Sequence, residues 1–216
     1  MSDKTTVLII DDHPMLRRGV MQLLALDDEL EAVGEASSGD EGIKQALALD
    51  PDLILLDLNM HGMSGIDTLK ALRTADVFSR VLVFTVSDNH EDVVSALKAG
   101  ADGYLLKDTE PEELLAAIKR AAAGEMPISE KLSSALAQAI SKRNRDREGS
   151  PSIDTLTERE KQILKAIATG DSNKMIARKL DITEGTVKVH VKKVLKKLSF
   201  RSRVEAAVWA VGQGIR

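Results

Sequence analysis

The stretch LILLDLNMHGMSG at residues 53–65 decides the fold of the first part of this 216-residue chain. Its first four residues are all apolar and too few for a helix, and Asp57 follows them directly, so they are predicted to form a strand. A strand that is apolar at every position is buried on both faces, as in a parallel sheet covered by helices. The stretch therefore predicts an α/β domain with a carboxylate at the end of a buried strand.

The sequence on either side of this strand alternates regularly. Further short apolar runs are predicted to be strands at 7–10, 31–35, 81–86 and 104–106. Helical patterns lie between and after the strands at 14–25, 40–48, 64–73, 91–99 and 111–123. This alternation predicts a doubly wound (βα)5 domain of the flavodoxin-like type over residues 1–126, with right-handed crossovers between parallel strands.

The rest of the chain has a different pattern. Residues 127–154 are predicted to hold a short linking helix, because Leu132, Leu136 and Ile140 share one helical face, followed by the apolar-free linker SKRNRDREGSPS. Residues 155–216 are predicted to form an all-α domain of four helices, whose first helix begins with a capping box at Thr157 and Glu160.

The distribution of charge separates the two domains. Residues 1–126 contain 24 acidic and 11 basic residues, whereas residues 153–216 contain 14 basic and 7 acidic residues, so the formal net charge of −4 averages two domains of opposite charge. Such an asymmetry indicates an anionic partner for the basic part. The absence of cysteine excludes disulfides and thiolate chemistry, and no apolar run approaches the about 20 residues of a membrane helix, so we expect a cytoplasmic protein without a membrane partner.

Polar residues follow the predicted strands at the edge where ligands of doubly wound sheets bind. These residues are Asp11, Asp12, Asp57, Thr85 and Lys107. Three carboxylates in one place repel one another, and a hard cation such as Mg²⁺ relieves the repulsion and leaves room for a phosphoryl group. A carboxylate can itself accept a phosphoryl group, whose charge the metal and the lysine would neutralise.

This set resembles the receiver domain of bacterial two-component response regulators, in the Asp11-Asp12 pair, LLDLNMHGMSG, Thr85 and GYLLK at 103–107. The resemblance implies that Asp57 is the phosphoacceptor and that Asp11, Asp12, Asp57 and the Asn59 carbonyl hold Mg²⁺. It further implies that Lys107 pairs with the phosphoryl group, that Thr85 bonds to it after transfer and that Tyr104 responds as a switch. Many receivers have proline where this chain has His61, so the loop after Asp57 is expected to be looser. We expect His13 and His61 to be loop residues without a catalytic role.

The third helix predicted in the basic domain has two distinct sides. Val187, Val191, Val194 and Leu198 recur at helical spacing and predict a core face. Lys188, Lys192 and Lys196 repeat at every fourth position and therefore line another side together, where an anion would relieve their repulsion. A short turn at Asp181-Ile182 separates this helix from the one before, which predicts a helix-turn-helix that reads double-stranded DNA in the major groove.

The segment LTEREKQILKAIATGDSNKMIARKLDITEGTVKVHVKKVLKKL resembles the LuxR/FixJ output domain, and together with the receiver the chain is identified as a member of the NarL/FixJ class. Motifs such as DDHPMLRRGV and GADGYLLKD are similar to its nitrate/nitrite regulators. The resemblance implies that Lys188, Val189 and Lys192 face base edges. Further phosphate contacts are expected from Lys196 and Lys197, and from Lys174, Arg178, Arg201 and Arg203.

The sequence thus predicts a transcription factor and not an enzyme, phosphorylated by a sensor histidine kinase and binding DNA as a homodimer, with RNA polymerase as a further partner. Regulators of the same class that serve other signals remain an alternative. A phosphotransferase is disfavoured because Asn59 stands where a second catalytic acid is wanted, and a receiver that is never phosphorylated is disfavoured by the complete set of pocket residues. The opposite charges further suggest that the receiver covers Lys188 and Lys192 before phosphorylation.

Overall fold

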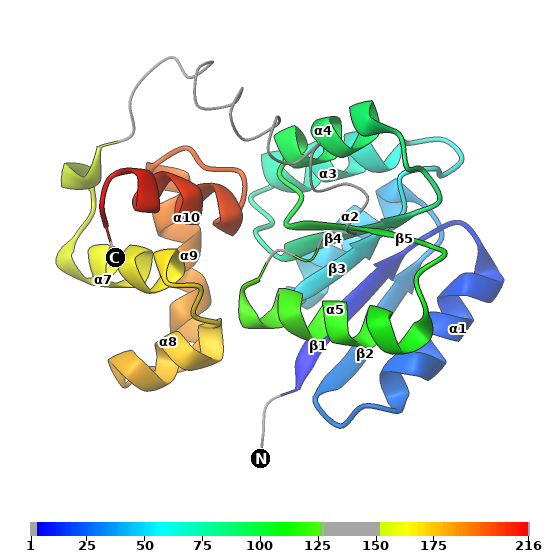
Figure 1. The fold of residues 1–216 in the computed structure, drawn as a ribbon, viewed down its shortest axis with the longest axis horizontal. Coiled ribbons are helices and arrows are strands. Elements are labelled where there is room, and N and C mark those ends of the chain that lie inside the picture. The colour runs from blue at the N-terminus through cyan, green and yellow to red at the C-terminus, as the bar shows by residue number, and fades with distance from the viewer. Residues whose placement is uncertain (1–3, 126, 128–151, 216) are drawn as a thin grey trace.

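The computed structural model describes residues 4–125, 127 and 152–215, which form an α/β domain followed by a helical domain (Figure 1). The expected linking helix and most of the linker fall outside the described residues. None of the described helices is long and apolar enough to cross a membrane.

The first domain contains a five-stranded parallel sheet in the order β2-β1-β3-β4-β5. Its strands are β1 (Thr5–Ile10), β2 (Leu30–Ala36), β3 (Leu53–Leu56), β4 (Arg80–Thr85) and β5 (Gly103–Leu106). Its helices are α1 (Pro14–Ala25), α2 (Gly39–Leu49), α3 (Gly65–Thr74), α4 (His90–Ala99) and α5 (Pro111–Ala123). The predicted doubly wound fold is confirmed, and the element ends differ from the prediction by at most two residues.

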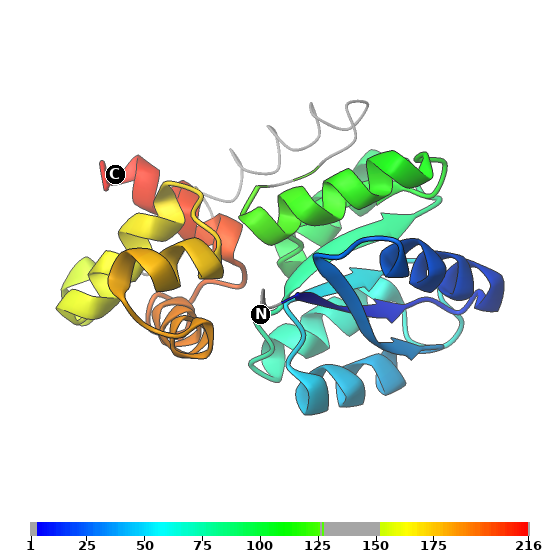
Figure 2. The same cartoon turned by 90° about the horizontal axis from the view of Figure 1, so that it is seen from below.

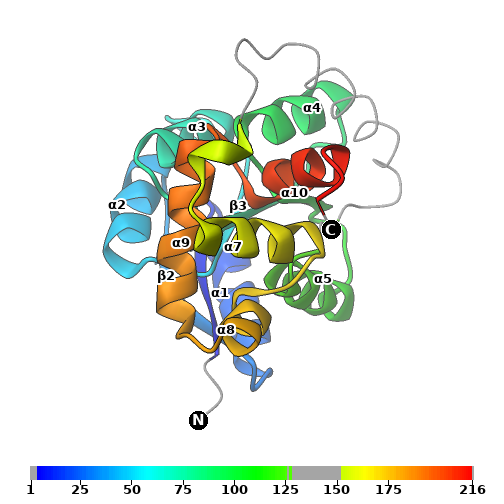
Figure 3. The same ribbon diagram turned by 90° about the vertical axis from the view of Figure 1, so that its left-hand side faces the viewer.

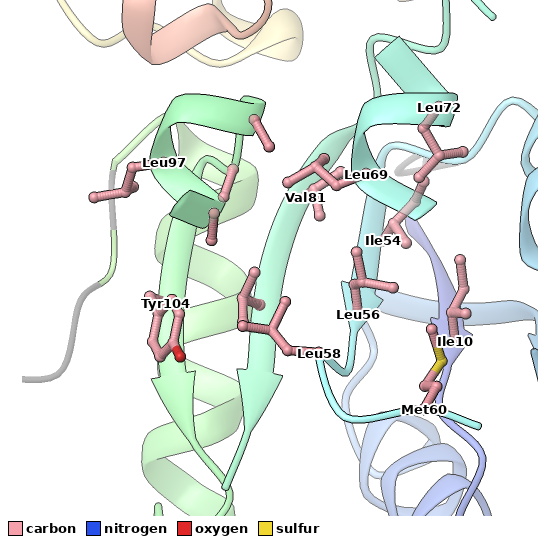
Figure 4. Close-up of a cluster of buried hydrophobic side chains, with 14 of the residues drawn as sticks. Ile10, Ile54, Leu56, Leu58, Met60, Leu69, Leu72, Val81, Leu97 and Tyr104 are labelled. Carbon is pink, nitrogen blue, oxygen red and sulfur yellow. The ribbon is translucent and has the colours of Figure 1, made fainter. Parts of the chain in front are cut away.

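Helices cover both faces of this sheet (Figure 2). Alternate residues of each strand point to opposite faces, so Leu8 and Ile10 join a core with α2, α3 and α4, whereas Val7 and Ile9 join a core with α1 and α5. All four residues of β3 are buried, as the apolar run predicts. Figure 4 shows the first of these cores, with Leu56, Leu69 and Tyr104 among its side chains.

The second domain consists of short helices around a separate core. They are η2 (Ile153–Thr155), α7 (Glu158–Ala168), α8 (Asn173–Leu180), α9 (Glu184–Lys197) and α10 (Arg203–Gly212). The capping box of Thr157 and Glu160 starts α7 as predicted. The 3-10 turn η2 was not predicted from the sequence pattern. The core gathers apolar residues such as Ile163, Val187 and Val194, and it confirms the four-helix prediction.

The helical domain lies against the end of the α/β domain where the strands begin, with α9 along the contact (Figure 3). Phe78, from the segment before β4, packs on the core of the helical domain. The contact therefore lies at the edge of the sheet formed by the beginnings of the strands, opposite the edge formed by their carboxyl ends.

Candidate functional site: an acidic pocket and a basic helix

The acidic pocket is assembled at the ends of three strands of the sheet, of which β1 and β3 are neighbours and β5 is separated from β3 by β4. Asp11 follows β1, Asp57 follows β3 and Lys107 follows β5. Backbone hydrogen bonds continue the ladder past the strand ends, because the Asp57 N–H donates to the Ile10 carbonyl at 2.9 Å and the Lys107 N–H donates to the Thr85 carbonyl at 2.8 Å. These bonds fix where each side chain starts, so the sheet itself holds the pocket in register.

Lys107 links two carboxylates in this pocket. Its Nζ lies 2.7 Å from Asp11 Oδ2 and 2.8 Å from Asp57 Oδ2, and its side chain is only 10% exposed. Burial alone would lower the pKa of Lys107, but its hydrogen bonds to Asp11 and Asp57 outweigh burial and raise that pKa. The lysine therefore stays charged and offsets part of the repulsion between the carboxylates.

The remaining oxygens of the pocket fit a divalent cation. Asp11, Asp12, His13 and Asp57 each offer a ligand atom, and these atoms all lie within 4.8 Å of one another. Asp12 Oδ1 is buried and accepts no hydrogen bond from the part of the chain that is described. An orphaned carboxylate oxygen beside two other carboxylates is a position that a hard cation such as Mg²⁺ would satisfy. Asn59 lies in the following loop, where its N–H donates to Asp57 Oδ1 at 3.2 Å.

Two histidines reach Asp12, a contact that the sequence reasoning missed. The Nδ1 atom of His13 lies 2.9 Å from Asp12 Oδ1, and that of His61 lies 2.5 Å from Asp12 Oδ2. Burial would raise the pKa of Asp12, but the hydrogen bonds from the backbone and side chain of His61 prevail, and the pKa is lowered. The run Asp11-Asp12-His13 is a sequence signal that could have suggested the first contact, whereas the second depends on the path of the loop.

Thr85 and Tyr104 meet the same loop beyond β4. Thr85 is fully buried, and its Oγ1 accepts a hydrogen bond from the Ser87 N–H, with 3.5 Å between the nitrogen and the oxygen. The buried Tyr104 hydroxyl donates to the Ser87 carbonyl at 2.8 Å, and burial raises its pKa to about 12. Figure 4 shows the Tyr104 ring lying along β5. The two predicted residues are thus connected through one loop residue, which gives a physical path from Thr85 to Tyr104.

The basic helix α9 packs one side on the helical core and turns lysines toward the α/β domain. Val187, Val191 and Val194 are buried as predicted. Lys188 Nζ lies 3.0 Å from Asp52 Oδ1, and Lys196 Nζ lies 2.7 Å from Asp76 Oδ2. Both carboxylates lie in segments that precede strands, so α9 faces the edge of the sheet opposite the acidic pocket.

Other predicted DNA contacts have varied surroundings. Val189, Lys192 and Arg178 are exposed, whereas Lys174 is half-buried. Lys197 binds Glu160 within its own domain at 2.7 Å. Arg203 is buried and donates to Asn173 Oδ1, and Arg201 donates to the Lys98 carbonyl.

A cleft of about 550 Å³ lies between the domains, lined by residues of both, Lys188 and Val189 among them.

Comparison with known proteins assigns each domain to a family. Residues 7–119 match the family described as the response regulator receiver domain, and residues 154–210 match the one described as bacterial regulatory proteins of the luxR family. Over 207 residues the chain is 58% identical to the nitrate/nitrite response regulator protein NarL of Escherichia coli K12, covering 96% of this chain and 95% of that one. It is 50% identical to NarP of the same strain over 204 residues, covering 94% and 92%.

Two solved structures are also similar. The response regulator ChrA of a heme-sensing two-component system has a TM-score of 0.51 at 32% identity, and 99% of both chains is covered. The signal receiver domain of the NarL protein of Mycobacterium tuberculosis has a TM-score of 0.55 at 37% identity, with 57% of this chain and 99% of that chain covered.

Proposed function

The chain belongs to the NarL-like response regulators, which join a receiver domain to a LuxR-family DNA-binding domain, and from this premise we propose that phosphorylation of Asp57 controls its binding to DNA. The observation that carries the proposal is the bridge of Lys107 between Asp11 and Asp57, with an orphaned carboxylate oxygen beside it. This set combines an acceptor carboxylate, a cation for the transferred group and ligands for Mg²⁺.

The proposed reaction moves a phosphoryl group from a phosphohistidine of a sensor kinase to a carboxylate oxygen of Asp57. The phosphorus–nitrogen bond breaks, the phosphorus–oxygen bond forms, and the imidazole leaves with its electron pair. Lys107 already touches Asp57 and would stabilise the negative oxygens of the group in flight. Mg²⁺, held by Asp11, Asp12, Asp57 and the Asn59 carbonyl, would supply further charge neutralisation when bound.

The response to phosphorylation would travel through the β4–α4 loop. The new acceptor oxygens would draw the Thr85 hydroxyl toward Asp57, which removes it from Ser87. Because the Tyr104 hydroxyl donates to the carbonyl of this same Ser87, a shift of the residue changes the position that Tyr104 prefers. Thr85 and Tyr104 are therefore positioning residues for the switch, and Asp57 and Lys107 are the residues that carry the chemistry.

The DNA-binding role falls to α9. We assign base contacts in the major groove to Lys188, Val189 and Lys192 and phosphate contacts to Lys196, Lys174 and Arg178. A homodimer on paired half-sites suits a helix-turn-helix of this size, and RNA polymerase would be the further partner at promoters. Because the partner is DNA, the protein would work in the cytoplasm. The names of its relatives favour nitrate or nitrite as the signal.

A masked state before phosphorylation is part of the proposal. Of the two lysines expected to be covered, Lys188 contacts a receiver carboxylate and Lys192 is exposed, while Lys196 contacts a second receiver carboxylate. Lys188 and Lys196 therefore cannot contact DNA in this arrangement. Phosphorylation at the opposite edge would shift the population toward a form that frees α9. Residues 153–216 should therefore bind DNA more tightly than the unphosphorylated full chain at low salt, and equal affinities at every salt concentration would contradict masking.

Phosphotransfer tests the central claim directly. We expect acetyl phosphate and Mg²⁺ to add one phosphoryl group to the full chain, seen by mass spectrometry, and to tighten DNA binding. Asp57→Asn should abolish both changes, whereas Asp67→Asn, an exposed carboxylate on α3, should alter neither. Transfer from a panel of purified sensor kinases would then identify the signal. A failure of Asp57 to accept the group would favour a receiver that acts only through protein contacts.

The rival proposal of a phosphotransferase has less support. An enzyme that turned over aspartyl phosphate would benefit from an acid two residues after the nucleophile, and Asn59 stands there. Turnover of a small phosphoester by the purified protein would revive this alternative.

A further inference from the structure

Two buried arginines, one from each domain, line the cleft between the domains. Arg80 is the first residue of β4 and is 9% exposed, and Arg203 is the first residue of α10 and is 7% exposed. Both line the cleft of about 550 Å³. Within the described part of the chain, neither guanidinium forms an ion pair with a carboxylate. Burying a cation is costly unless an anion compensates its charge, so the pair calls for an explanation.

The hydrogen bonds of the two guanidinium groups go to neutral oxygens. Arg80 donates from Nη1 to the Ala121 carbonyl. Arg203 donates to Asn173 Oδ1 at 2.8 Å and to the Asp171 carbonyl. A guanidinium has five N–H donors, so each group keeps donors that no described residue uses. These bonds hold the two side chains in place and leave both charges uncompensated.

The carboxylates that act electrostatically on the two arginines already have cations of their own. They are Asp52, Asp102 and Asp171. Their partners are Lys188 at 3.0 Å, Arg73 at 3.1 Å and Lys179 at 2.7 Å, respectively. Burial lowers the pKa of Arg203 well below its usual range, and repulsion from Arg80 adds to this effect. The cleft therefore holds two like charges that repel each other, with no described carboxylate paired to either.

A third polar group stands beside Arg80. Ser79 lines the same cleft, and its buried hydroxyl makes no hydrogen bond within the described residues. Guanidinium groups bind oxyanions of the phosphate class through paired N–H donors, and a hydroxyl can donate one more hydrogen bond. Two positive charges and a hydroxyl donor thus suit a tetrahedral dianion.

This set of donors is complete only in the docked arrangement, in which the helical domain lies against the receiver. A Cβ added at Gly124, just after α5, would lie 2.5 Å from the Gly170 carbonyl oxygen of the helical domain and 3.5 Å from Arg80 Nη2. The backbones of the two domains therefore meet beside Arg80. Because Ser79 and Arg80 belong to the receiver and Arg203 to the helical domain, an anion that contacts all three stabilises the docked arrangement.

We propose that the cleft binds a phosphate-class oxyanion between Arg80 and Arg203, with Ser79 as a further donor, and that the anion holds the two domains together. The cleft has room for inorganic phosphate or for the phosphate group of a small ester. The anion is then a negative effector of DNA binding, a step that rests on the masked state of the proposed function. Anion binding is measured without DNA, so the two claims can fail separately.

Calorimetric titration of the full chain with sodium phosphate tests the site, with sodium chloride keeping the ionic strength constant. We expect binding at one site, weakened by at least about tenfold in Arg80→Gln and in Arg203→Gln, each of which removes a guanidinium. Arg80→Lys keeps the charge but loses the paired donors, so it should weaken binding less than Arg80→Gln. Titration with glycerol 3-phosphate distinguishes an ester from free phosphate as the preferred source. Nitrate, a monoanion, should bind more weakly than phosphate.

Lys119 provides the matched control. It lines the same cleft, but its ammonium already pairs with Asp27 at 2.6 Å and with Glu29 at 3.2 Å. Lys119→Gln also removes one positive charge, and it should change the affinity for phosphate by less than about twofold. Cooperative urea unfolding of each variant checks that it is folded.

Fluorescence anisotropy with a labelled duplex tests the effector role. At constant ionic strength, phosphate should weaken DNA binding by the unphosphorylated full chain and have no effect on Arg80→Gln. Absent phosphate binding, equal binding in the wild type and both glutamine variants, or tighter binding of nitrate than of phosphate would overturn the site. Bound phosphate without an effect on DNA would overturn the effector role. Phosphorylation of Asp57 that still tightens DNA binding would leave the proposed function standing in every case.

Discussion

The two edges of the receiver sheet both hold charged residues, and they use them differently. At the edge where the strands end, Lys107 lies almost buried between Asp11 and Asp57. At the opposite edge, Lys196 meets Asp76 in an exposed pair 2.7 Å long. Opposite charges at similar distances thus occur in two dielectric environments. Coulomb energy grows several-fold as the effective dielectric constant falls, so the environment decides which contacts are strong.

This difference separates chemistry from docking. A buried charge keeps its partners because leaving them costs several kcal/mol, which suits a site that must stay assembled. An exposed pair contributes little and is screened by salt, which suits a contact between domains that must open. The receiver thus keeps a rigid pocket at one edge and a releasable surface at the other.

The largest expected effect comes from a buried pair at the edge of the sheet that faces α9, which we call the docking edge. The pair itself makes no contact with α9 among the interactions described above. Arg73 donates to the Val77, Ser79 and Gly100 carbonyls and to Asp102, with both side chains nearly buried. Arg73→Leu should lower the free energy of unfolding by about 4 kcal/mol, because Asp102 is left buried without its cation. Urea unfolding measures this loss.

The control for Arg73 is the exposed Arg18 on α1. Arg18→Leu should leave the free energy of unfolding within about 0.5 kcal/mol of the wild type. Equal effects of the two substitutions would break the comparison, because burial would then not decide the strength of a charge.

Lys107→Ala should have the next largest effect. Removing the ammonium leaves Asp11 and Asp57 to repel each other, and we expect the free energy of unfolding to fall by about 2 kcal/mol. This loss is smaller than that expected for Arg73→Leu because water and cations can reach the pocket. Mg²⁺ should restore more stability to this variant than to the wild type. Thermal unfolding with and without Mg²⁺ measures the difference, and identical Mg²⁺ effects in both proteins would contradict the role of Lys107 as a substitute cation.

The sequence predicted the pocket better than the docking edge, for a physical reason. Strand ends in a parallel sheet are fixed by the apolar pattern, so the pattern alone was enough to place Asp11, Asp57 and Lys107 together. The loop that carries His61 has no periodicity, and its contact with Asp12 could not be foreseen. Exposed acidic residues such as Asp76 likewise have no pattern that distinguishes a docking partner from solvated surface.

The basic domain repeats this lesson. The spacing of Val187, Val191 and Val194 predicted the buried side of α9, because apolar periodicity follows from packing. The role of individual cations was harder to predict. Arg203, the first residue of α10, is buried and donates a hydrogen bond to Asn173, although the sequence suggested a phosphate contact.

Tyr104→Phe gives a smaller effect with a definite dependence on pH. The variant loses the hydrogen bond to the Ser87 carbonyl, and we expect a loss of about 1 kcal/mol at neutral pH. The folded-state pKa of about 12 lies above the ordinary 10, so the folded chain holds the proton more tightly. The wild type should therefore lose stability as the pH rises from 10 to 12, and the variant should lack this contribution. Chemical unfolding across this range checks the sign, and parallel curves would contradict it.

The smallest effect belongs to the exposed pair. Asp76→Asn removes the partner of Lys196 without changing any residue of α9, so it can weaken docking and leave the DNA-binding surface intact. The pKa of Asp76 is lowered mainly by its hydrogen bond to Lys196, so at neutral pH the carboxylate is charged and the contact is made. We expect the unphosphorylated variant to bind DNA about twofold more tightly than the wild type at low salt.

Salt provides the control, because it screens the exposed pair. The gain from Asp76→Asn should therefore disappear as the salt concentration rises, whereas Asp67→Asn, which alters an exposed carboxylate away from α9, should give no gain at any salt concentration. Fluorescence anisotropy with a labelled duplex measures all three proteins. If the gain in DNA affinity persisted at high salt, apolar contacts such as that of Phe78 with the helical core would be holding the domains together. The docking edge would then resemble the buried pocket more than its exposed charges suggest.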